Sequence, residues 1–178
     1  MYVKNHEMGH KVDIAIRASL ILLCVAYLIV GFPGYEPLPK ITSNADAFVL
    51  NTIGVHTINE GRYLVVAFPQ VSRIYELSSE CCGLILFAMF FIAVFLVPNF
   101  SYKHRLVAVL FLPIIFFGNI IRIALGVLIG YHVSADASVF FHDTFGQIFI
   151  FIWVIVCFLL WLKITRNFPS EEKVVMKL

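Results

Sequence analysis

The chain has 178 residues, enough for one domain, because a typical domain takes about 100 to 200 residues. Hydrophobic residues make up 61% of it and charged residues 13%, against roughly 45–50% and about 25% in ordinary soluble proteins. This composition predicts an integral membrane protein in which residues 1–178 form a single membrane-embedded domain. A formal net charge of +2 without a basic patch argues against a nucleic-acid partner.

Four apolar segments read as membrane spans, because a spanning helix needs about 20 apolar residues. The expected spans are residues 14–32, 82–97, 106–131 and 144–162. The first reads as a retained anchor, since no A-x-A type cleavage site follows it. We therefore expect an all-α integral membrane protein with about four transmembrane helices.

The segment between the first two spans is mixed and polar, and too rich in charge to cross a membrane. Within it, the β-prone runs 54–58 and 62–67 flank Asn59-Glu60-Gly61, a sequence typical of a hairpin turn. Residues 71–79 are ambiguous and are read as a short interfacial helix. The expected segment is thus a small extracytoplasmic unit with a candidate β-hairpin.

The distribution of positive charge predicts the orientation in the membrane. Nine Lys and Arg residues fall in the N-terminal tail, the loop 100–105 and the C-terminal tail. Three fall in the long segment between the first two spans, and none in the expected loop 132–143. Both termini are therefore expected in the cytoplasm of a multi-pass plasma-membrane protein, with segment 34–79 and loop 132–143 outside.

A cysteine stands where a polar stretch enters the second apolar segment. Cys81 is expected at or just before the first helical turn, where free amide hydrogens and the helix dipole favour a thiolate. A deprotonated cysteine is the attacking species in acyl transfer. The alternative is a small buried residue at a helix end, a common role for cysteine.

The fourth span starts at the same level with His142. A histidine there can take the thiol proton and return it to a leaving amine; the alternative is an ordinary interfacial polar residue. Asp143 is a secondary candidate for orienting His142, because adjacent residues on a helix point in different directions. Gly146, one turn further on, would let another helix or a substrate backbone approach closely, or would serve ordinary helix packing.

Arg122 is the strongest single signal, because a guanidinium in hydrocarbon costs about 3 kcal/mol even on lenient scales and usually marks function. It could steady an oxyanion or clamp a carbonyl or carboxylate of the substrate. Asn119, three positions earlier on the same helix face, could hold Arg122 by a hydrogen bond. The alternative role of Arg122 is an internal salt bridge to Glu80 or Asp143.

Three motifs, Cys81-Cys82-Gly83, Asn119-x-x-Arg122-Ile123 and His142-x-x-x-Gly146, together resemble the exosortase/archaeosortase family of membrane cysteine transpeptidases. The resemblance covers about residues 60–162. It implies catalytic roles for Cys81 as nucleophile, for Arg122, and for His142, where some members have arginine. Cys82 replaces the usual small hydroxyl residue or alanine, so either cysteine could attack; Cys81 keeps the cysteine-x-glycine spacing that ends at Gly83.

The resemblance also implies a substrate class. Members of this family are thought to cut C-terminal sorting signals from exported proteins and to pass the acyl group to a cell-surface acceptor. Such a signal has a short motif, a spanning helix and a basic tail. No cofactor is implied, and no metal site is expected, because the loop histidines His56, His104 and His132 lack ligand spacing.

A second interpretation is a four-helix membrane thiol–disulfide oxidoreductase of the quinone-linked type. Such proteins need paired outward thiols, normally C-x-x-C, whereas this chain has only the adjacent pair Cys81-Cys82. A haem-binding bundle is disfavoured as well, since no histidines face each other in mid-span.

Overall fold

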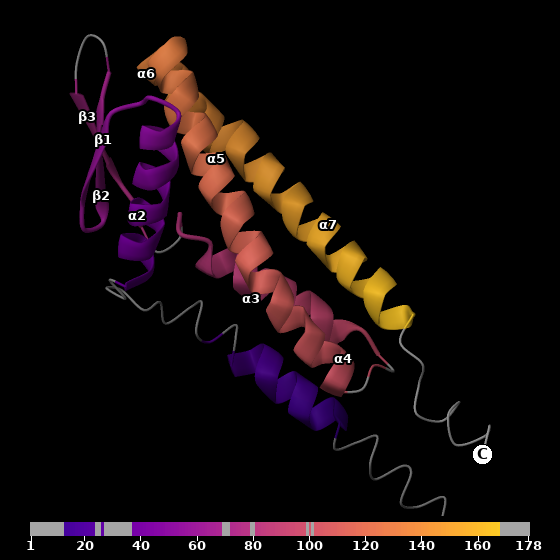
Figure 1. Cartoon of the computed structure of the whole chain (residues 1–178). Helices are drawn as coiled ribbons and strands as arrows, with labels where there is room; N and C mark the ends of the chain where they lie inside the picture. Colours follow the sequence, from indigo (N-terminus) through magenta and orange to yellow (C-terminus); the bar gives the residue numbers. More distant parts are fainter. Residues whose placement is uncertain are drawn as a thin grey trace, which may run out of the picture.

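The computed structural model of the chain describes residues 13–23, 26, 37–68, 72–78, 81–98, 100 and 102–167. Two long apolar rods dominate it (Figure 1). The first joins α4 (Tyr102–Leu106), the 3-10 segment η1 (Val107–Phe111) and α5 (Leu112–His132). The second joins α6 (Ala135–Phe140), the π-helical segment η2 (Phe141–Phe145) and α7 (Gly146–Arg166).

Both rods exceed the length that a bilayer requires. They contain 31 and 32 residues, which at 1.5 Å per residue is about 45 Å, against about 30 Å of hydrocarbon. The other two expected spans are not established. Segment 82–97 contains α3 (Leu84–Leu96), whose 13 residues reach only about 20 Å. Of segment 14–32, residues 14–23 are helical and most of the rest lies outside the described residues.

Local sequence explains where the rods tighten and restart. Pro113 has no N–H, so it cannot make the usual helical hydrogen bond to the carbonyl of Val109. The N–H of Leu112 donates to that carbonyl instead, which makes this turn a 3-10 turn. The expected loop 132–143 is wrong: helix resumes at Ala135. Ser134 caps it by accepting the N–H of Ala137 at 3.1 Å, which satisfies a free donor of the first turn.

The segment before Cys81 contains a helix and a sheet, so the protein is not all-α. Helix α2 (Pro37–Thr52) begins at a proline. Proline is tolerated in a first turn because the backbone N–H that it lacks would have no helical acceptor there. Strands β1 (Thr57–Glu60), β2 (Tyr63–Ala67) and β3 (Ser72–Glu76) form an antiparallel sheet in the order β1-β2-β3. The expected interfacial helix at 71–79 is therefore wrong, since β3 occupies it.

Helix α5 belongs to two cores. Its C-terminal half packs against α2 and the inner face of the sheet, where Leu50, Leu64 and Val127 are buried. Its N-terminal half packs with α3 and α7, around Phe90 and Ile150. Figure 1 shows the sheet and α2 beside one end of the rods, with α3 toward the other. The candidate site lies where these two cores meet.

Candidate active site

A tight turn carries Cys81 into helix α3. The N–H of Cys81 donates to Oγ of Ser78 at 3.3 Å, and the N–H of Cys82 donates to the Ser78 carbonyl at 3.1 Å. Gly83 then adopts a left-handed φ of 89°, a conformation that glycine reaches without steric cost. The helix begins at Leu84, so the thiol stands three residues before it.

Asn119 fastens this turn to helix α5. Its Nδ2 donates to the carbonyl of Cys81 at 2.8 Å, and the side chain is fully buried. The expected hydrogen bond from Asn119 to Arg122 is not the contact that forms. Because Asn119 and Arg122 share one face of α5, the helix that carries Arg122 also fixes the position of the cysteine backbone.

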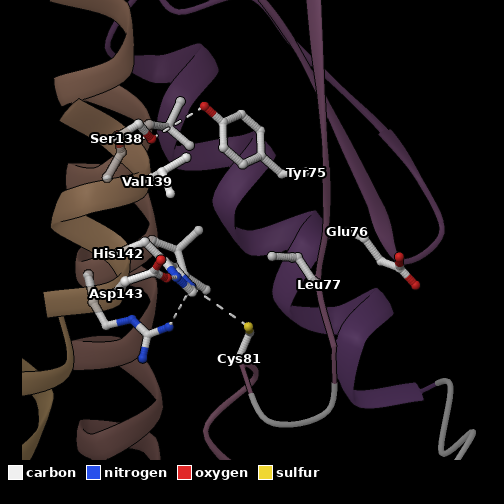
Figure 2. Close-up of a pocket in the computed structure, with 12 residues that line it drawn as sticks. Tyr75, Glu76, Leu77, Cys81, Ser138, Val139, His142 and Asp143 are labelled. Atoms are coloured by element: carbon white, nitrogen blue, oxygen red, sulfur yellow. Dashed lines mark hydrogen bonds and ion pairs between the residues drawn. The ribbon is translucent and has the colours of Figure 1, made fainter. Parts of the chain in front are cut away.

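His142 lies at the centre of the site, between a thiol and a guanidinium (Figure 2). Its Nε2 is 3.8 Å from Sγ of Cys81 and 3.2 Å from Nη2 of Arg122. Its Nδ1 is 3.0 Å from Oδ1 of Asp143. Arginine can only donate, so Nε2 accepts and Nδ1 carries the hydrogen that Asp143 accepts. In this tautomer the imidazole offers the thiol an unprotonated nitrogen.

The contact between His142 and Asp143 forms within η2. On a regular α-helix, adjacent side chains diverge, which made Asp143 a secondary candidate. The wider turn of a π-helix changes these directions, and such turns are frequent at functional sites. Both side chains are partly open to solvent, 41% for His142 and 68% for Asp143, so their pairing is a weak interaction.

Arg122 is buried, and Gly146 leaves room for it. The residue is only 4% exposed. A Cβ built on Gly146 would lie 3.4 Å from Cγ of Arg122 and 3.1 Å from the carbonyl oxygen of Phe141. The missing side chain of Gly146 thus lets the aliphatic part of Arg122 run along α7 toward His142.

The two cysteines have opposite environments. When the Cys81 proton moves to Nε2, the imidazolium donates to the thiolate, and this hydrogen bond lowers the pKa of the Cys81 thiol to about 7. Burial opposes the shift, and the hydrogen bond from Ser78 and the charge of Arg122 aid it. Burial raises the pKa of the fully buried Cys82 to about 11. Cys81 therefore loses its proton far more readily than Cys82, which stays protonated at neutral pH.

Two hollows meet at these residues. A cavity of about 190 Å³ extends from Cys81, Arg122 and His142 along β3, with α5 and α6 as its other walls. Figure 2 shows Tyr75 reaching toward α6 in this cavity. A second hollow of about 200 Å³ shares the same three residues and opens between α3 and α7, next to Gln147. The site is therefore accessible from two directions.

Sequence reasoning missed two polar residues near the site. Ser78, which holds the turn, lay in the stretch read as an interfacial helix. Asp46 is fully buried on α2, and its carboxylate oxygens have no hydrogen-bond partner among the described residues. Its position on the buried face of a helix in a polar segment gave no sequence signal. No group of His, Cys, Asp and Glu in the described part of the chain could hold a metal.

The comparisons with known proteins identify the family. The family model for transmembrane exosortases matches residues 8–162. The chain belongs to the transmembrane exosortase family. The match to the exosortase family begins well before the expected range of 60–162, so it includes the segment that contains α2 and the sheet. The comparisons with curated proteins and with solved structures each found no match.

Membership of the exosortases places the protein among the membrane transpeptidases of the cysteine type. It also implies exported proteins as substrates. In this exosortase the described residues bring together the cysteine, arginine and histidine of the three sequence motifs.

Proposed function

We propose that this exosortase is a cysteine transpeptidase that removes C-terminal sorting signals from exported proteins. It then transfers the shortened proteins to a surface acceptor. Cys81 is the nucleophile, His142 the general base and acid, and Arg122 the oxyanion-stabilising group. The observation that carries the proposal is the 3.8 Å separation of Sγ and Nε2, with Nδ1 of the same ring bound to Asp143. A nucleophile, a base and an orienting group in this order are the usual signature of nucleophilic catalysis.

The first half of the reaction forms a thioester. Sγ of Cys81 attacks the scissile carbonyl while Nε2 of His142 takes the thiol proton. The C–N bond then breaks, and the leaving amine receives that proton and departs with the membrane helix and basic tail. An acceptor amine or hydroxyl, or water, then attacks the thioester and regenerates the thiol.

Arg122 changes partner during this cycle. It donates to Nε2 of neutral His142 in the resting site. A protonated imidazole cannot accept that bond, so the guanidinium is released when His142 takes the proton. The negative charge on the substrate oxygen arises in the same step, and a buried guanidinium stabilises it more strongly than water would.

The position of the site along the rods supports an outward-facing active site. Arg105 precedes Arg122 by 17 residues, and Lys163 follows His142 by 21, which correspond to about 25 and 32 Å of helix. These separations match the thickness of the hydrocarbon layer, about 30 Å. With the basic ends in the cytoplasm, Cys81 lies at the outer surface, and α2 and the sheet lie beyond it.

The environment of Cys82 supports Cys81 over its neighbour as the nucleophile. Cys82 is enclosed by Leu77 and Ile123, and burial holds its pKa near 11. The same enclosure disfavours the thiol–disulfide alternative, since a dithiol pair needs both sulfurs to meet a partner.

The proposal is tested by Cys81→Ala in cells that express the enzyme and an epitope-tagged exported protein ending in a motif, a spanning helix and a basic tail. Uncut precursor should accumulate with Cys81→Ala, and processing should continue with the control Cys82→Ala. Cleavage that continues in Cys81→Ala would rule out this nucleophile.

A further inference from the structure

Strand β3 is an edge of the sheet in the described part of the chain, because it pairs with β2 on one side only. The N–H of Leu77 donates to the carbonyl of Arg62, which fixes the phase of the ladder. In an antiparallel pair, alternate residues direct their backbone groups to the partner strand. The N–H and C=O groups of Ile74 and Glu76 therefore point to the open side.

This open edge runs beside the cavity that ends at the thiol. Tyr75, Glu76 and Leu77 line the cavity. The Tyr75 ring points toward α6, and the Glu76 carboxylate points away from the catalytic group (Figure 2). Ile74 and Glu76 are exposed. Leu77, which follows β3, and Cys81 line the same cavity, so the open edge and the nucleophile border one space.

We propose that the substrate binds as an extended strand, parallel to β3, with its backbone hydrogen-bonded to Ile74 and Glu76 and its scissile carbonyl at Cys81. The inference rests on the proposed function, in which the occupant is a peptide. Addition of a strand to a sheet edge is a common mode of peptide recognition, because unpaired N–H and C=O groups match any extended main chain.

The direction of the strand follows from the substrate's own tail. Strand β3 runs toward Cys81 and ends near it, and the sorting signal continues into its membrane helix after the cleaved bond. A peptide parallel to β3 brings its C-terminal end to the thiol and then to the membrane. The antiparallel direction would carry the membrane helix away from the rods.

The cavity adds one side-chain subsite to this backbone docking. Apart from the catalytic group, its walls are mainly apolar, with Val127, Val139 and the ring of Tyr75 among them. Its far end is closed by Tyr75, whose hydroxyl lies 3.4 Å from Oγ of Ser138. A cavity of about 190 Å³ accepts a single side chain. The strand therefore presents one apolar residue of the motif here, and its other residues stay on the exposed edge.

Proline at position 74 tests the main-chain contact. The N–H of Ile74 faces the open side, so Ile74→Pro removes that donor without breaking the ladder to β2, and proline is tolerated on such edges. The control Ile74→Thr changes the same exposed side chain and keeps the N–H. The readouts are the initial rate of precursor cleavage in membranes and the rate of Cys81 alkylation by iodoacetamide in the absence of substrate.

Ile74→Pro should slow precursor cleavage by about tenfold or more, through a lost hydrogen bond and the bulk of the ring, while Ile74→Thr stays within about twofold. Cys81 alkylation should be unchanged in both variants, which shows that the site remains folded. Equal cleavage rates for Ile74→Pro and Ile74→Thr would overturn strand docking. A cleavage defect in Ile74→Pro no larger than its loss of alkylation would also overturn it, because the slower cleavage would then come from a disturbed thiol and not from the missing N–H.

A failure of strand docking is distinguishable from a failure of the proposed function. If cleavage depends on Cys81 but not on the N–H of Ile74, only the docking mode is wrong. If precursor cleavage persists in Cys81→Ala, the proposed function is wrong whatever proline at position 74 does.

Discussion

Sγ of Cys81 lies 3.8 Å from Nε2 of His142, although 61 positions separate the two residues in the chain. The cysteine comes from the turn before α3, and the histidine from the π-helical segment before α7. Helix α5 holds both, through Asn119 to the cysteine backbone and through Arg122 to the imidazole. This arrangement gives definite expectations for reactivity, activity and stability.

The pH dependence of thiol reactivity should identify Cys81. Because contact with His142 lowers its pKa to about 7, its alkylation rate should rise through pH 7 and level off near pH 8. His142→Ala removes the largest cause of this shift, so the pKa should rise and the rate at pH 7 should fall about tenfold or more. Stopped-time alkylation followed by peptide mass spectrometry measures both. An unchanged profile in His142→Ala would contradict the pairing.

Asp143 should act as a positioning residue. It accepts Nδ1–H of His142 at 3.0 Å but is well exposed, so its loss should cost less than the loss of the imidazole. We expect Asp143→Ala to slow precursor cleavage by about tenfold, and Asp143→Asn, which keeps an acceptor oxygen, to be milder. The ratio of the two cleavage rates is the measurement. A defect as complete as that of His142→Ala would mean that Asp143 has a larger role.

Gly146→Ala should disturb Arg122 without unfolding the protein. The added methyl group would lie 3.1 Å from the Phe141 carbonyl oxygen, so η2 and α7 must separate by a few tenths of an ångström, and the methyl group would also contact Cγ of Arg122 at 3.4 Å. A misplacement of about 1 Å can reduce an enzyme's rate by about a hundredfold, so this smaller displacement should reduce the cleavage rate by roughly tenfold. Cys157→Ala, a small change in the buried face of the same helix, is the control. Cleavage rates and detergent melting curves should separate activity from stability, and equal cleavage by both variants would contradict this role.

Asp46 should make the protein less stable as pH rises. Burial raises the pKa of its carboxyl group to about 8, against the effect of Arg122, whereas in the unfolded chain it is about 3.8. Between these values the unfolded state gives up a proton that the folded state keeps, so stability falls with rising pH. Asp46→Asn removes this dependence. At pH 8 it should raise the free energy of unfolding by on the order of a few kcal/mol, and with it the melting temperature.

The comparison for Asp46 is made at two pH values in the same detergent. The advantage of Asp46→Asn should be much smaller at pH 5 than at pH 8, because the loss of stability accumulates as the pH rises above the unfolded-state pKa of 3.8, and pH 5 lies only about one unit above it. An advantage of equal size at both pH values would show that the carboxyl is ionised in the folded protein. Circular dichroism melts provide this measurement.

The residues of the candidate site could be named from the sequence because polar or reactive side chains are rare, and energetically unfavourable, within or beside apolar segments. A buried Arg122 and a Cys81 at the edge of an apolar segment each indicate a polar site in a membrane protein. Their closeness in space could be expected only from the membrane topology, which places the start of the second apolar segment at the same membrane face as the start of the fourth. Asp143 could be named only as a secondary candidate, since π-helical geometry leaves no local signature.

The segment before the site was harder to predict. Proline usually ends a helix, yet it also fits a first helical turn, and here Pro37 begins α2. Strand β3 is short and mostly exposed, so its sequence lacks the alternation that distinguishes a strand from a helix. The partner of Asn119 depended on the turn of Cys81, a contact between distant parts of the chain.

The most direct test of the account is the covalent intermediate. Purified enzyme incubated with precursor and quenched in acid should carry the substrate acyl group as a thioester on Cys81, detected by mass spectrometry of the modified peptide. Hydroxylamine should release it, and His142→Ala should accumulate far less. An acyl group found on Cys82, or precursor cleavage with no thioester at any time under these conditions, would contradict the central claim.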